Sequence, residues 1–145
     1  MDETGIDSYL YREYAYSLKG EPVYGAVGGR EYRRTGLVAA QQNGEILAPL
    51  QYDGTMDSTL FEFWFEQCLM RALPPKSVIV MDNAAFHRKS RLPLLAQKYG
   101  HRLIFLPPYS PEFNPIEHFW ARIKHRLKST LPKFEHFDDA LAACF

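Results

Sequence analysis

The chain has 145 residues, 46% of them hydrophobic, which is enough for one domain with a sizeable core. It has no run of 18 apolar residues, and its first residues lack the basic start and apolar stretch of a secretory signal. Two cysteines without metal-type spacing, Cys68 and Cys144, are typical of a reducing compartment. We therefore expect a cytoplasmic protein that neither spans a membrane nor relies on disulfides.

The formal net charge is zero, but the charges are unevenly distributed. Residues 1–82 contain 7 Lys/Arg and 12 Asp/Glu, whereas residues 83–145 contain 10 and 5, so the halves carry −5 and +5. The basic half would attract a phosphate backbone. A solvated surface with unevenly spread charges explains the same asymmetry, so charge alone does not decide between the two interpretations.

The first half of the chain predicts a turn at 19–22 and then a β-hairpin. Residues 35–41 and 45–52 are the two predicted strands, and Asn43-Gly44 between them is a strong signal for a tight hairpin turn. Pro49 lies inside the second strand and has no N–H to donate to a neighbour. This strand is therefore expected at an edge of the sheet or with a bulge.

A helix is predicted from about residue 57, with a capping-box pattern at 59–62, to the Pro74-Pro75 pair that stops it. Its apolar residues recur at helical spacing, so we expect one face to lie in the core, with Cys68 as a buried packing thiol. The predicted face consists of Leu60, Phe61, Trp64, Phe65, Cys68, Leu69 and Ala72.

The second half of the chain alternates between strand and helix. Residues 77–81 and 102–106 are continuous apolar runs, typical of strands buried on both faces, and a helix is predicted from Ser90 to Gly100 between them. A hairpin followed by alternating helices and strands predicts an α/β fold with a mixed sheet, parallel later strands and helices on both faces. Sites in such sheets form at the carboxyl ends of strands, and Asp82 is at such an end.

A stiff, proline-rich loop leads into the last long helix. Asn114 is predicted as its N-cap, Pro115 as its first residue and Glu117 as its third. In this interpretation Glu117 only closes a capping box with Asn114 and favours the positive end of the helix. The predicted core stripe of the helix is Ile116, Phe119, Trp120, Ile123, Leu127 and Leu131.

A second interpretation of Glu117 comes from the flank of that stripe. At about 100° per residue, Glu117, Ala121, Lys124 and Lys128 share one flank. The flank offers a carboxylate for a metal ion and two cations for DNA phosphates. Arg122, His125 and Arg126 lie on other parts of the exposed surface.

Acidic residues far apart in the sequence can meet at one metal site, and three carboxylates on rigid elements suit a two-metal phosphoryl-transfer site. Asp82 and Glu117 are the main pair, although Asp82 and Asn83 also fit a simple role in capping a turn. The third acid stays open among Asp2, Asp7, Asp53 and Asp57. The five histidines show no zinc-binding pattern, and only His87 is expected near the chemistry.

Three segments of the chain are distinctive, namely D-E-T-G at 2–5, V-I-V-M-D-N-A-A-F-H at 78–87 and L-P-P-Y-S-P-E-F-N-P-I-E-H-F-W at 106–120. Together they resemble the bacterial insertion-sequence branch of the mariner transposase superfamily. The third segment is long and specific, and the 34 residues between Asp82 and Glu117 match the spacing typical of that superfamily's DDE triad. G-T-M-D-S at 54–58 also looks like the bacterial branch.

The resemblance implies that residues 1–145 form an RNase H-like catalytic domain, a mixed sheet flanked by helices, with the triad Asp2, Asp82 and Glu117. Asp2 is selected over its competitors only because D-E-T-G matches the family's first motif. The implied cofactor is Mg²⁺, with Mn²⁺ as a substitute, held as two ions by the triad, because hard carboxylate oxygens suit either ion. Three further residues are expected to support the site, namely Asn83, His87 and Asn114.

The implied activity is metal-dependent DNA strand cleavage and strand transfer in the transposition of an insertion sequence. The implied partners are DNA, as transposon ends and as target, and further copies of the chain in an active oligomer near the nucleoid. Four basic side chains are the predicted DNA contacts: Arg122, Lys124, Arg126 and Lys128.

Two features depart from the family pattern. Helix-turn-helix domains, which recognise transposon ends in the family, are not found in the sequence, so a separate helix-turn-helix polypeptide is an alternative source of that recognition. Only Met1 precedes Asp2, so the first central strand is expected to be truncated.

The alternative function is an inactive remnant that binds DNA or a transposase partner. A general RNase H-like nuclease is a third hypothesis, which the segment at 106–120 disfavours.

Overall fold

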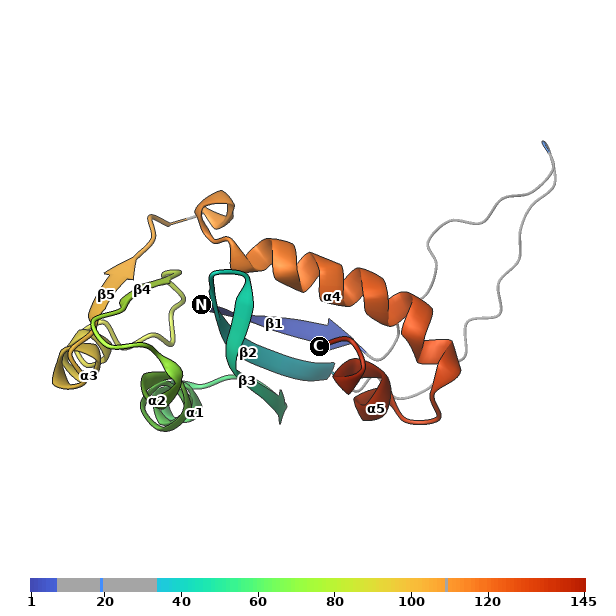
Figure 1. Ribbon diagram of the computed structural model, residues 1–145, viewed down its shortest axis with the longest axis horizontal. Helices are drawn as coiled ribbons and strands as arrows, with labels where there is room; N and C mark the ends of the chain where they lie inside the picture. Colours follow the sequence, from blue (N-terminus) through green and yellow to red (C-terminus); the bar gives the residue numbers. More distant parts are fainter. Residues whose placement is uncertain (8–18, 20–33, 109) are drawn as a thin grey trace.

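In the computed structural model, two β-sheets and the helices around them enclose two hydrophobic cores (Figure 1). The structure describes residues 1–7, 19, 34–108 and 110–145. Apart from Lys19, the turn predicted at 19–22 lies outside these residues. None of the helices in the described part of the chain is long and apolar enough to cross a membrane.

The first sheet is antiparallel, and its middle strand is covered on both faces. Its strands, in spatial order, are β1 (Asp2–Asp7), β2 (Arg34–Gln42) and β3 (Glu45–Asp53). Side chains along β2 alternate between the two cores, with Leu37 and Ala39 in one and Val38 and Ala40 in the other. Because both faces are buried, β2 fixes the position of β1 beside it.

The predicted hairpin is confirmed. Asn43 and Gly44 connect β2 to β3 with φ of 52° and 87°, the positive values that a tight two-residue turn requires. The predicted irregularity at Pro49 is also present, because the register shifts opposite Val38 and Ala40, and Ala48 has a φ of 49°. β3 lies at the edge of the sheet, where the missing N–H of Pro49 is tolerated.

The helix predicted after the hairpin is formed by three consecutive segments. They are α1 (Ser58–Trp64), a π-helical turn (Phe65–Leu69) and α2 (Met70–Ala72). The predicted capping box at 59–62 is wrong, because the side chain of Asp57, in extended backbone conformation, accepts the N–H of Leu60 at 2.8 Å. Cys68 is half-buried rather than fully buried.

The second sheet contains two parallel strands, as predicted. They are β4 (Val78–Met81) and β5 (Arg102–Phe105), connected through α3 (Leu92–Lys98). The prediction that both strands are buried on both faces is wrong, since Val78 is 57% exposed and Ile104 is also exposed. The expected single mixed sheet is divided into two, and the Met1 amino group links them by donating to the carbonyl of Val80 at 2.8 Å.

The last long helix packs along the first sheet. Figure 1 shows α4 (Ile116–Thr130) running beside β1–β3, with α5 (Phe137–Ala142) at its far end. The predicted core stripe is largely confirmed, because Ile116, Trp120, Ile123 and Leu127 are buried, whereas Phe119 and Leu131 are partly buried. These side chains share a core with Ile6, which lies near the end of β1. Figure 1 shows the start of α4 near the start of β1.

Helices therefore pack on both sides of the first sheet. The core on one side contains residues of α1, α3 and β4, and the core on the other side contains residues of α4 and α5. The predicted α/β class, with mixed strands flanked by helices, is confirmed.

Trp64 is expected to be a main support of this arrangement. Its side chain is fully buried, and its Nε1 donates to the carbonyl of Ala48 at 2.7 Å, which joins α1 to the bulged edge strand. Trp64→Phe removes the donor and leaves that carbonyl without its partner, so we expect the free energy of unfolding to fall by about 1–3 kcal/mol in urea titrations. The neighbouring control, Phe63→Leu, changes a side chain that is 60% exposed and should shift stability by no more than about 0.5 kcal/mol. Equal unfolding midpoints for the two variants would contradict this role.

Candidate functional site

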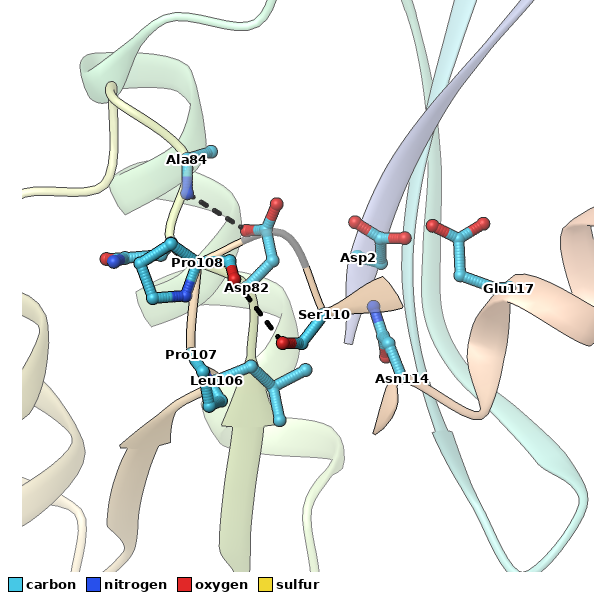
Figure 2. Close-up of a pocket in the computed structure, with 10 residues that line it drawn as sticks. Asp2, Asp82, Ala84, Leu106, Pro107, Pro108, Ser110, Asn114 and Glu117 are labelled. Carbon is cyan, nitrogen blue, oxygen red and sulfur yellow. Dashed lines mark hydrogen bonds between the residues drawn. The ribbon is translucent and has the colours of Figure 1, made fainter. Parts of the chain in front are cut away.

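A pocket opens where the start of β1, the carboxyl end of β4, the loop after β5 and the start of α4 come together (Figure 2). Its volume is about 390 Å³. Figure 2 shows the carboxylates of Asp2, Asp82 and Glu117 along its rim, with Asp2 between the other two. The residues that line it are Asp2, Asp82, Asn83, Ala84, Leu106, Pro107, Pro108, Ser110, Asn114 and Glu117.

Asp2 is the buried member of the three acids. It is the first residue of β1, pairs in register with Ala39 of β2 and is only 6% exposed. Burial, followed by repulsion from Glu117 and Asp82, raises the pKa of Asp2 to about 7. The carboxylate is therefore costly to ionise in the metal-free protein, and a nearby cation would relieve that cost.

Asp82 directly follows β4 and is held by the turn that it begins. Its Oδ1 accepts the backbone N–H of Ala84 at 3.3 Å, and the Nδ1 of His87 lies 3.2 Å from the same oxygen. The close approach of His87 is the main reason that the pKa of Asp82 is below its usual value. The side chain is 44% exposed, so an ionised carboxylate faces the pocket.

Glu117 lies in the first turn of α4 and is exposed. The predicted capping box is wrong, because the N-cap position belongs to Pro115 and no side chain caps the helix. Asn114 contributes its carbonyl instead, which accepts the N–H of Glu117 at 3.1 Å. The carboxylate of Glu117 is therefore not used as a cap and remains available to the pocket.

The other acids proposed for the third position lie elsewhere. Asp7 is at the far end of β1, Asp53 ends β3, and Asp57 caps α1. None of these three lines the pocket, whereas Asp2 does. The structure thus brings Asp2, Asp82 and Glu117 to one place from three separate elements.

The predicted support residues occupy different positions. Asn83 and Asn114 line the pocket, and the Oδ1 of Asn83 is buried without a hydrogen-bond partner among the described residues. His87 is buried behind Asp82, outside the pocket lining. Sequence reasoning missed Glu3, whose Oε2 lies 3.9 Å from the Nε2 of His87.

Burial, followed by repulsion from Asp2 and Asp82, raises the pKa of Glu3 to about 8. Strand alternation was a signal that could have pointed to this residue. Because side chains alternate along β1, Glu3 must point to the side of the sheet opposite Asp2, toward the core that contains α1. A buried acid is uncommon in proteins unless it has a partner nearby.

The predicted DNA-binding residues divide between two sides of α4. Lys124 is half-buried and Lys128 is exposed, and both continue along the helix from Glu117. Arg122 and Arg126 line another cavity with Phe145, and Arg126 donates to the carbonyl of Cys144 at 3.5 Å. The two lysines alone therefore extend the flank that begins at Glu117.

The donor chemistry of the pocket fits Mg²⁺ or Mn²⁺. Three carboxylates offer hard oxygen ligands, and the repulsion that raises the pKa of Asp2 favours a cation among them. Within the described residues, no three His, Cys, Asp or Glu side chains are close enough to share one ion as they stand. Joint coordination would therefore require these carboxylates to move toward one another.

Comparisons with known proteins gave a similar sequence and a similar solved structure. Uncharacterized protein y4pE/y4sA of Sinorhizobium fredii (strain NBRC 101917 / NGR234) is 34% identical over 68 residues, which are 47% of this chain and 47% of that protein. The match thus spans about half the length of this relative. The catalytic core domain of BIV integrase superposes with a TM-score of 0.49 at 16% identity, over 74% of this chain and 77% of that one.

A family match covers nearly the whole chain. The family described as "DDE superfamily endonuclease" matches residues 1–139, a stretch that includes all three pocket carboxylates. The chain therefore belongs to the DDE superfamily endonucleases.

Proposed function

We propose that the chain is the catalytic domain of an insertion-sequence transposase of the mariner type, with an RNase H-like fold, which cuts DNA strands and joins them to a target in a metal-dependent reaction. The observation that carries the proposal is the meeting of Asp2, Asp82 and Glu117 in one pocket. Family membership supports nuclease chemistry of this type. The proposed cofactor is a pair of Mg²⁺ ions, which Mn²⁺ can replace.

Each carboxylate has a distinct task in this proposal. Asp82 presents an ionised oxygen at the pocket, Asp2 forms the buried wall, and Glu117 closes the site from α4. Bound divalent cations would activate the attacking hydroxyl and stabilise charge on the scissile phosphate. The chain itself holds its ligands on three supported elements, so catalysis depends on positioning and needs no covalent intermediate.

The substrate in this proposal is DNA that crosses the pocket and follows α4. Lys124 and Lys128 lie C-terminal to Glu117 on the same helix, where they would contact phosphates beyond the scissile one. Recognition of transposon ends is assigned to helix-turn-helix elements, on this polypeptide or a separate one, and activity to an oligomer assembled on DNA.

A non-catalytic remnant that binds DNA or a transposase partner is the second candidate. It is favoured by one observation, namely that no three potential ligands among the described residues are close enough to share an ion. Metal binding that depends on the pocket carboxylates would argue against the remnant.

Removal of one pocket carboxylate should abolish DNA nicking. We expect Asp82→Ala and Glu117→Ala each to reduce Mg²⁺- or Mn²⁺-dependent nicking of DNA that carries the element's ends by at least about 100-fold, because electrostatic stabilisation of phosphoryl transfer is lost. The control Glu135→Gln changes an exposed acid outside the pocket and should retain activity. Full nicking by either alanine variant would refute the proposal.

Asp2→Asn should change how the stability of the metal-free protein depends on pH. The folded-state pKa of about 7 lies above the usual 3.8, so wild-type stability should fall as pH rises between these values, and the loss should be complete above them. Because asparagine cannot ionise, the melting temperature of the variant should exceed that of wild type at pH 8, by roughly 2–4 °C for each kcal/mol of stability that wild type loses. The difference should be smaller at pH 5. Parallel melting profiles for the two proteins would exclude the raised pKa of Asp2. Glu135→Gln is the control expected to follow wild type.

The Lys124→Ala/Lys128→Ala double variant should weaken DNA binding in a salt-dependent manner. Each lost phosphate contact should lower the slope of log K against log salt by about 1, so a change of about 2 is expected in fluorescence anisotropy titrations. Arg122→Ala/Arg126→Ala removes the same charge from the side of α4 that lines the other cavity, and should have a smaller effect. Equal losses for both pairs would indicate a general charge effect rather than a DNA path along the Glu117 flank.

A further inference from the structure

We propose that His87 is a positioning residue that fixes the carboxylate of Asp82 for divalent-cation binding, an inference that rests on the proposed function. His87 lies outside the pocket lining, yet its Nδ1 is 3.2 Å from Oδ1 of Asp82. Its effect would therefore pass through Asp82 and not through direct contact with DNA.

The contacts leave Asp82 with one engaged oxygen. Both the N–H of Ala84 and the Nδ1 of His87 approach Oδ1. An ionised carboxylate can only accept hydrogen bonds, so the Nδ1 that faces it carries a proton. The 3.2 Å separation is within hydrogen-bond distance, but the angle between the ring and the carboxylate is too poor for a hydrogen bond, so the contact is a close electrostatic one. With Oδ1 engaged from behind, the second oxygen is left to face a ligand in the pocket.

The ring of His87 is held so that it cannot turn away from Asp82. Its side chain is only 1% exposed, and the ring lies 4.3 Å from the ring of Phe61 and 4.5 Å from that of Phe86, measured between centroids. The N–H of His87 also donates to the carbonyl of Ala84 at 3.1 Å, which closes the turn after Asp82.

The turn is itself anchored to α1. The hydroxyl of Ser58 donates to the carbonyl of Phe86 at 2.7 Å, and buried Glu62 pairs with Arg91 at 3.1 Å. These contacts place His87 on a fixed segment between the core that contains α1 and the pocket. Asp82 therefore receives its orientation from a rigid support.

Burial of a polar ring in an aromatic environment is costly unless its nitrogens have partners. Neither ring nitrogen of His87 makes a hydrogen bond within the described residues, and the groups nearest to them are both acids, Asp82 at 3.2 Å from Nδ1 and Glu3 at 3.9 Å from Nε2. The buried His101 provides a contrast, because its Nδ1 accepts the backbone N–H of Ser77 and holds the chain together away from the pocket. His101 therefore has an ordinary structural role, and it supplies a matched control.

Calorimetric titration with Mn²⁺ on the whole chain tests the proposal. His87→Ala should weaken Mn²⁺ affinity by about 10–100-fold, the usual cost of losing a partner of a metal ligand. His87→Asn keeps an amide at the position of Nδ1 and should bind close to wild type, whereas His87→Gln places it at the position of Nε2 and should resemble the alanine variant. His101→Ala should retain wild-type affinity, which separates loss of support to Asp82 from loss of a buried histidine.

The outcomes distinguish this proposal from the function on which it rests. The positioning role alone would be overturned if the wild type binds Mn²⁺ and His87→Ala binds it with the same affinity. Equal Mn²⁺ affinities in His87→Asn and His87→Gln would also overturn it. Failure of the wild type to bind Mn²⁺, or binding unaffected by Asp82→Asn, would overturn the proposed function as well. If thermal unfolding shows that His87→Ala does not fold, the comparison of the asparagine and glutamine variants decides.

Discussion

The burial of Asp2 beside two other carboxylates is the constraint that the rest of the structure has to accommodate. Asp2 is almost fully buried, and its pKa is raised by that burial and by Glu117 and Asp82. Like charges gathered in this way destabilise a fold unless a proton or a cation neutralises them. Costs of this kind concentrate at functional sites, because a packing role would be filled better by apolar side chains.

The two cores explain how the fold tolerates that cost. β2 is buried on both faces and holds β1, and therefore Asp2, in register. α4 is fixed by Trp120 and its neighbours against the opposite side of the same sheet, which places Glu117. Asp82 is held by a turn that α1 supports through Phe61 and Ser58. Each acid thus has separate support, so the pocket can be assembled against its own electrostatic repulsion.

Features with a local cause could be predicted from the sequence. Asn43-Gly44 determines its turn by its own backbone preferences, and the spacing of Trp120, Ile123 and Leu127 determines the buried face of α4. The choice between neighbouring caps was harder to predict, since Asp57 caps α1 although the four-residue pattern at 59–62 pointed to Thr59.

Features that depend on distant contacts could not be predicted from the residues alone. The exposure of Val78 depends on which strand lies beside β4, and an apolar run does not contain that information. Asp2 was selected by motif similarity and not by physical reasoning, because nothing local separated it from Asp7. The approach of Glu3 to His87 joins residues that are 84 positions apart in the sequence, so finding it required the folded structure.

The central claim is that Asp2, Asp82 and Glu117 hold divalent cations together. Anomalous diffraction at the manganese edge, from crystals equilibrated with Mn²⁺, tests it most directly. The account predicts anomalous peaks in the pocket, within coordination distance of all three carboxylates, which will have moved toward one another. The absence of a peak there, or a peak bound by other residues only, would contradict it.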